Sequence, residues 1–294
     1  MTLRRSPWGI GAACLGVAAL SLLAPWAPTY DPWAWLVWGR EVAGLELDTS
    51  AGPAWKPLPV LATTLLAPLG GAAPWLWLLL ARAGGILAVI LAFRLAARLA
   101  GGRGRWFAGC VAVLGLVSTT GFLRGVAGGS SEGLLIALLL LAFERHLDGH
   151  RSQAFALGTA AALLRPEVWP FLAVYAVWLW RREPEARRLV AALLPLVPLL
   201  WFLPELWGSG DLLRSSERAQ VPNAGAPTLA DLPALEVVQR FLRMLVPPIA
   251  VAALGAAVLA MRRREAPLLA LLGGTLGWVA LVAVMSEAGY SGEE

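Results

Sequence analysis

The sequence predicts an all-α, polytopic membrane protein that forms a single transmembrane domain over residues 1–294. Hydrophobic residues make up 58% of the chain and charged residues 15%, whereas a soluble domain carries about 25% charged residues. Several apolar runs approach the roughly 20 residues that a helix needs to cross a bilayer. Arginines gather between these runs, where membrane proteins carry their topology signals. We therefore expect about nine transmembrane helices, with juxtamembrane helices on the extracytoplasmic side.

The first apolar run covers residues 8–26 and is expected to be an uncleaved span. The charged start at Arg4 and Arg5 also fits a cleaved signal peptide. In both cases the basic N-terminus stays in the cytoplasm and Asp31 emerges outside. The loop that follows is consequently expected to be extracytoplasmic.

The segment 30–59 is the first polar stretch, and we expect the function to be organised around it. An Asp-Pro pair at Asp31 is typical of a helix start, so we predict a helix over residues 31–43 with Asp31 as its N-cap. Its tryptophans are expected to lie in the headgroup layer of the membrane. Residues 45–56 are predicted to be irregular. The proline-interrupted run 57–69 is too short to span and is expected to be a second juxtamembrane or re-entrant helix.

The remaining apolar runs predict the other spans, with a seven-span core over about residues 8–240 and two further spans over about 241–286. Residues 204–240 form the longest polar stretch and are expected to lie outside. The last residues resemble the opening of another loop, so we expect a C-terminally truncated chain. The spans expected after the first are residues 74–99, 106–123, 133–143, 152–164, 168–180, 189–203, 241–261 and 267–285.

The basic character of the chain does not indicate a nucleic-acid-binding protein. The net charge is +5, but the cations are scattered between apolar runs instead of forming one patch. Cys14 and Cys110 lie inside apolar runs without disulfide or metal-binding spacing. His146 and His150 lack a third ligand and are expected to belong to a basic cytoplasmic edge. We assign no metal-binding residues and leave a divalent metal open as a cofactor.

The extracytoplasmic face collects carboxylates and cations, the mixture that chemistry on a lipid phosphate requires. A carboxylate can take a proton from an acceptor hydroxyl, and an arginine can hold a phosphate through two hydrogen bonds. The candidate catalytic residues are Asp31, Glu41 and Asp48. The candidates for binding substrate or phosphate are Arg40, Lys56, Arg124, Glu132, Arg165, Glu167, Arg214 and Arg218.

Most of these candidates also have a structural explanation, which for Arg214 and Arg218 is a solvated loop. Asp31 could act only as a helix cap, and Lys56 could anchor the chain at the membrane surface beside Trp55. Arg165 and Glu167 could form an ion pair at the mouth of a span, because a charge there needs a partner or a polar cavity.

The order of these features resembles the GT-C superfamily of membrane glycosyltransferases, in particular actinobacterial-type members that use polyprenyl-phosphate sugars. The resemblance covers about residues 8–240. It is carried by Tyr30-Asp31, Trp38-Gly39-Arg40-Glu41, Lys56-Pro57-Leu58-Pro59, Ser131-Glu132 and Leu164-Arg165-Pro166-Glu167.

The resemblance implies that Asp31 is a general base, which deprotonates the acceptor while a lipid phosphate leaves with inversion at the sugar. Many members carry a second acid directly after the first. Pro32 stands in that position here, so Glu41 and Asp48 are the alternatives for that role.

We therefore expect a glycosyltransferase, for example a mannosyltransferase, in the plasma membrane of the cell envelope. Its partners would be the lipid bilayer, a polyprenyl-phosphate-linked sugar and a glycan, lipid or protein acceptor, but no nucleic acid. A transporter or lipid flippase is the first alternative and would place charges inside the spans. A non-enzymatic membrane assembly subunit is the second, and it would tolerate the loss of every outer carboxylate.

Overall fold

The protein is helical throughout the part of the chain that the computed structural model describes, residues 7–24, 27–244 and 246–290. The expected cytoplasmic Arg4 and Arg5, and residues 291 and 292 of the loop opening expected at 289–292, lie outside these ranges. The helices are α1 (Pro7–Ser21), α2 (Tyr30–Gly44), α3 (Pro57–Leu66), η1 (Ala67–Ala72), α4 (Ala73–Ala100), α5 (Arg105–Ser118), α6 (Phe122–Ala127), α7 (Glu132–Leu147), α8 (Arg151–Ala162), η2 (Pro166–Val168), α9 (Trp169–Arg182), η3 (Pro184–Ala186), α10 (Arg187–Leu193), α11 (Leu196–Ser209), α12 (Arg214–Ala219), η4 (Pro227–Leu229), α13 (Pro233–Met244), α14 (Pro247–Arg263) and α15 (Ala266–Glu287).

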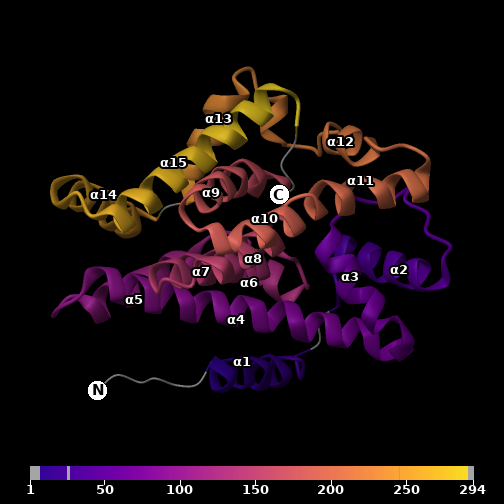
Figure 1. The fold of residues 1–294 in the computed structure, drawn as a ribbon, viewed down its shortest axis with the longest axis horizontal. Coiled ribbons are helices and arrows are strands. Elements are labelled where there is room, and N and C mark those ends of the chain that lie inside the picture. The colour runs from indigo at the N-terminus through magenta and orange to yellow at the C-terminus, as the bar shows by residue number, and fades with distance from the viewer. Residues whose placement is uncertain (1–6, 25–26, 245, 291–294) are drawn as a thin grey trace.

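Helix α4 is the central element, and α1, α5 and α7 pack against it (Figure 1). Its 28 residues would extend about 42 Å at the rise of an α-helix. Glycines let α4 and α7 approach closely, because a Cβ on Gly133 would lie 2.9 Å from the Cα of Gly85. Close backbone approach through small residues is typical of helix packing in membranes.

The prediction of nine spans was wrong. Three helical segments among the described residues are long and apolar enough to cross a membrane, and a fourth is added if the bent pair α13–α14 counts as one span. The three segments are Pro57–Ala100, Pro184–Ser209 and Ala266–Glu287.

Four of the expected spans form short helices instead. Helices α5, α7, α8 and α9 have 14, 16, 12 and 14 residues. Such helices extend about 18–24 Å, less than the roughly 30 Å of a bilayer's hydrocarbon core. A turn at Gly121, with φ of 87°, follows the end of α5 at Ser118 and shortens the expected span 106–123. The other three expected runs, 133–143, 152–164 and 168–180, are themselves shorter than a membrane span. The first expected span likewise forms α1, of 15 residues.

The elements around the first polar segment agree more closely with the sequence. Residues 45–56 are irregular, and α3 is the short helix that was expected directly after them. Helix α4 corresponds to the expected span 74–99. Helix α2 forms as predicted, but Thr29 is its N-cap and Asp31 lies inside its first turn. The prediction of Asp31 as N-cap was therefore wrong. The polar stretch 204–240 also contains helices α12 and α13.

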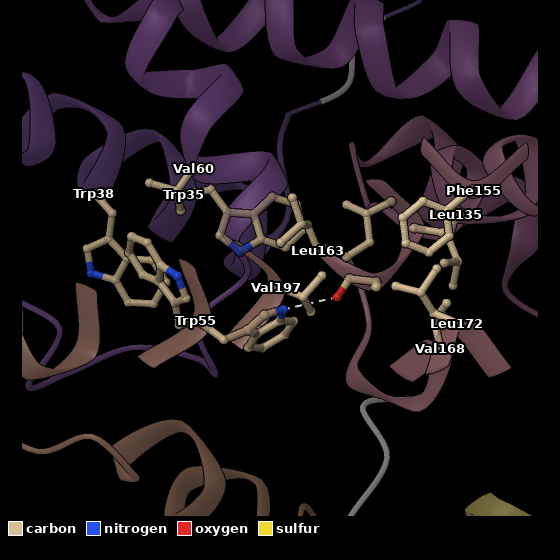
Figure 2. Packing of buried hydrophobic residues seen from close by; sticks show 14 of the residues in the cluster. Trp35, Trp38, Trp55, Val60, Leu135, Phe155, Leu163, Val168, Leu172 and Val197 are labelled. Carbon is tan, nitrogen blue, oxygen red and sulfur yellow. Dashed lines mark hydrogen bonds between the residues drawn. The ribbon is translucent and has the colours of Figure 1, made fainter. Parts of the chain in front are cut away.

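A tryptophan-rich core joins α2 to the helices that follow α7 (Figure 2). Trp35 and Trp38 are 1% and 3% exposed, so their rings pack inside the protein, whereas Trp33 on the same helix is 45% exposed. Trp35 packs edge-on against Trp77 at a centroid distance of 5.5 Å, and Trp38 contacts Trp55 at the same distance. This core fixes the start of α2 and the segment before α3 relative to one another.

Candidate active site

The first polar contact of the site joins Asp31 to Lys56. The Lys56 Nζ lies 3.5 Å from Oδ2 of Asp31 and 5.2 Å from the ring centroid of Trp35. The Lys56 side chain is 4% exposed and that of Asp31 is 28% exposed. Residue Leu58 donates its N–H to the carbonyl of Leu163 at 3.1 Å. This bond holds the start of α3 beside the end of α8, where the second polar group lies.

The second polar group is centred on Arg165. Its Nη2 donates to Oε1 of Glu132 at 2.8 Å, and its Nη1 lies 3.7 Å from Oε1 of Glu167. Burial raises the pKa of the Glu132 carboxyl. The charges of Arg165 and Lys56 and hydrogen bonds from Ser130 and Arg165 outweigh burial and lower that pKa to about 2. Glu132 also lies in the first turn of α7, where the helix dipole favours a negative charge.

Glu167 is the second carboxylate beside Arg165. Its side chain is 9% exposed, and its Oε2 is buried with no hydrogen-bond partner among the described residues. Buried polar atoms in folded proteins nearly always have a partner. Glu167 is therefore a buried carboxylate whose recorded partner among the described residues is Arg165.

Four of these residues, Asp31, Lys56, Arg165 and Glu167, border one cavity of about 460 Å³, whereas Glu132 does not line it. The cavity contains five residues that the sequence analysis selected, and they come from four separate parts of the chain. The five are Asp31, Lys56, Arg165, Glu167 and Arg218. The remaining wall is largely aromatic and aliphatic, and includes Trp55, Trp169, Trp201, Phe202, Leu212, Val221 and Met285.

Helix α12 closes one side of the cavity through contacts that the sequence did not reveal. Ser215 Oγ accepts a hydrogen bond from the backbone N–H of Trp55 at 2.6 Å and donates one to Oε1 of Glu205. Glu205 is fully buried. Arg214 donates to the carbonyls of Pro53 and Gly52 at 2.7 and 2.9 Å. Arg214 therefore holds the loop before Lys56 instead of facing the cavity.

Sequence reasoning missed Ser215 and Glu205 because no local pattern marks them. Ser215 and Trp55 are 160 residues apart. The only available signals were the position of Ser215 beside Arg214 and a carboxylate at Glu205 inside an apolar run, where a charge is costly.

Three other candidates lie away from this cavity in the described part of the chain. Glu41 accepts the backbone N–H of Asp48 at 3.2 Å. Asp48 accepts the N–H of Ser50 at 2.8 Å and its hydroxyl at 2.5 Å, which lowers the pKa of the Asp48 carboxyl. These two carboxylates stabilise the turn after α2. Arg124 is exposed on α6.

Arg40, the last candidate, lines a different cavity on the other side of α2. Among the described residues, no group of three His, Cys, Asp or Glu side chains could hold a metal ion. No protein-family model, curated protein or solved structure matches the chain. The chemistry of the 460 Å³ cavity is consequently the basis for a functional assignment.

Proposed function

We propose that the protein is a GT-C-like membrane glycosyltransferase. It would move a sugar, such as mannose or another pyranose, from a polyprenyl-phosphate donor to an extracytoplasmic acceptor. The observation that carries this proposal is the cavity in which Asp31 and Glu167 lie with Lys56, Arg165 and Arg218. Carboxylates that could move a proton and cations that could hold a phosphate meet there on an apolar wall.

Asp31 is the proposed general base. Its side chain is partly exposed and lines the cavity, so it could accept the proton of an acceptor hydroxyl. The new glycosidic bond would form as the bond between the sugar and the lipid phosphate breaks. General-base catalysis of this kind contributes about 10²–10⁴-fold.

Lys56, Arg165 and Arg218 are the proposed phosphate-binding residues. An arginine can hold two phosphate oxygens at once, while a lysine acts as a point charge. Glu132 and Glu167 orient Arg165. Apolar walls with a few convergent polar groups are typical of sites that bind small molecules, and the aliphatic part of this wall suits a prenyl chain.

A transporter would need charges inside its spans, and two buried charged residues, Arg82 and Glu205, lie within the candidate spans of the described chain. Glu205 accepts a hydrogen bond from Ser215 and lies 3.6 Å from Arg214, so it has partners near the end of its segment. Arg82 lies within Pro57–Ala100 and is 5% exposed. Its guanidinium donates to the carbonyls of Ser21 and Ala127 at 2.6 and 3.0 Å. These bonds join α1 and the end of α6 to α4, which favours a structural role for Arg82.

The test is a transfer assay in membranes that contain the protein, with radiolabelled polyprenyl-phosphate sugars as donors. We expect label to reach an extracytoplasmic acceptor with release of polyprenyl phosphate. We expect no direct transfer when the same sugar is supplied as a nucleotide sugar. Arg218→Gln should weaken donor binding, with Arg181→Gln as the matched control. Movement of the intact donor across the bilayer without release of polyprenyl phosphate would contradict the proposal and support a flippase.

A further inference from the structure

A second cavity, of about 540 Å³, lies between α2, η1 and the start of α4. Trp33, Leu36 and Arg40 of α2 line it. An α-helix turns about 100° per residue. These three residues therefore share one face of α2, and Asp31 and Trp35 lie on the opposite face. One helix therefore borders two separate cavities, and the second contains none of the acids of the first.

The lining of this second cavity is almost entirely apolar. Its two polar side chains are Arg40 and Thr63, and the Thr63 hydroxyl already donates to the carbonyl of Trp35 at 2.6 Å. Arg40 is exposed, and no hydrogen bond or ion pair to its side chain is recorded among the described residues. Arg40 is therefore the charged group in this cavity that remains available to a ligand, and it would attract an anion.

The surroundings indicate where such an anion would come from. Much of the cavity wall belongs to Pro57–Ala100, the longest of the described segments that could cross a membrane. Trp33 and Trp75 line it and are 45% and 50% exposed. Tryptophan is enriched at the level of lipid headgroups, and a cation near that level attracts anionic lipids.

We propose that this cavity binds one anionic phospholipid of the bilayer. The phosphate would contact Arg40, and part of an acyl chain would lie against Trp33 and Trp75. Since no carboxylate lines the cavity, a headgroup with a net negative charge is favoured over a zwitterionic one. The phosphate-binding role predicted for Arg40 from the sequence then applies to a bilayer lipid, and it does not depend on the proposed enzymatic activity.

The test is native mass spectrometry of the full-length protein in detergent, after removal of bound lipid and addition of phosphatidylglycerol or phosphatidylcholine at equal mole fraction. We expect one phosphatidylglycerol to be retained in preference to phosphatidylcholine. Arg40→Gln should weaken this binding about fivefold, the effect of one arginine near a membrane surface. Arg181→Gln, which removes an exposed arginine outside both cavities, should leave it unchanged.

A second variant tests the cavity without altering the charge. Gly71 lines it, and a Cβ at this position meets no atom within 4 Å. Gly71→Phe should therefore fill the space, keep the helical content measured by circular dichroism, and lower phosphatidylglycerol retention. Equal retention of both lipids by the wild type would overturn the proposal. The proposal would also be overturned if a folded Arg40→Gln or Gly71→Phe protein bound phosphatidylglycerol as strongly as the wild type.

Discussion

Arg165 shows how single side chains build the proposed active site. Two carboxylates face its guanidinium, Glu132 at 2.8 Å and Glu167 at 3.7 Å. The sequence identified Arg165 and Glu167, because a charge at the end of an apolar run needs a partner or a cavity, and Glu132 through the resemblance to GT-C glycosyltransferases. It could not show that Glu132 pairs with Arg165, since the pair joins residues 33 positions apart.

The ion pair of Glu132 predicts a defined pH dependence of stability. The pKa of this carboxyl falls from its ordinary value of 4.5 to about 2 in the folded protein. The pair therefore stabilises the fold fully above about pH 4.5, and this contribution is lost as the pH falls toward 2. Glu132→Gln should lower the free energy of unfolding by about 1 kcal/mol at pH 7 and flatten its decline between these pH values.

Thermal unfolding in detergent at pH 7 and pH 3 measures this effect. Glu46→Gln is the control, because it removes the same charge from an exposed position. A Glu132→Gln protein with the same pH profile as the wild type would show that the pair does not stabilise the fold.

At the scale of elements, the contact between α2 and α3 positions the site. A Cβ on Gly39 would lie 2.5 Å from Oγ1 of Thr63 and 2.6 Å from its carbonyl carbon. Thr63 Oγ1 in turn donates to the carbonyl of Trp35 at 2.6 Å. The two helices therefore touch through their backbones, and this contact sets the distance between Asp31 and Lys56.

Gly39→Ala should force α3 away from α2. Overpacking of this kind costs about 1–3 kcal/mol, so we expect a lower unfolding temperature and weaker donor binding. Gly44→Ala is the matched control, because a Cβ on Gly44 meets nothing within 4 Å. This control should be neutral or slightly stabilising, since alanine favours helix more than glycine does. Equal stability of the two variants would mean that the helix contact is not tight.

Helix type was predictable from the sequence, but helix length was not. Helix α4 is uninterrupted and was predicted almost to its ends. Helices α7 and α8 were expected to span but end within 16 and 12 residues. Apolar composition alone does not distinguish a span that faces lipid from a short helix buried in the protein.

At the scale of the whole molecule, the distribution of arginines predicts which face is outside. We expect Asp48 and the cavity of Asp31 to be extracytoplasmic and the end of α9 to be cytoplasmic. Cysteine labelling tests this topology in a Cys110→Ser background, because the remaining Cys14 is buried.

A membrane-impermeant maleimide should label Asp48→Cys in intact cells. It should label Arg181→Cys, an exposed position at the end of α9, only after the membrane is permeabilised. Labelling of both positions from the same side would contradict this arrangement.

The most direct test of the proposed active site compares Asp31→Asn with Asp48→Asn in the transfer assay, at matched protein levels. Both residues were candidates from the sequence, but only Asp31 lines the cavity. Asp31→Asn should reduce transfer at least about 10²-fold, the scale of a lost general base, while Asp48→Asn should stay within a few-fold of the wild type. Full activity in Asp31→Asn, or an equal loss in Asp48→Asn, would place the catalytic base outside this cavity.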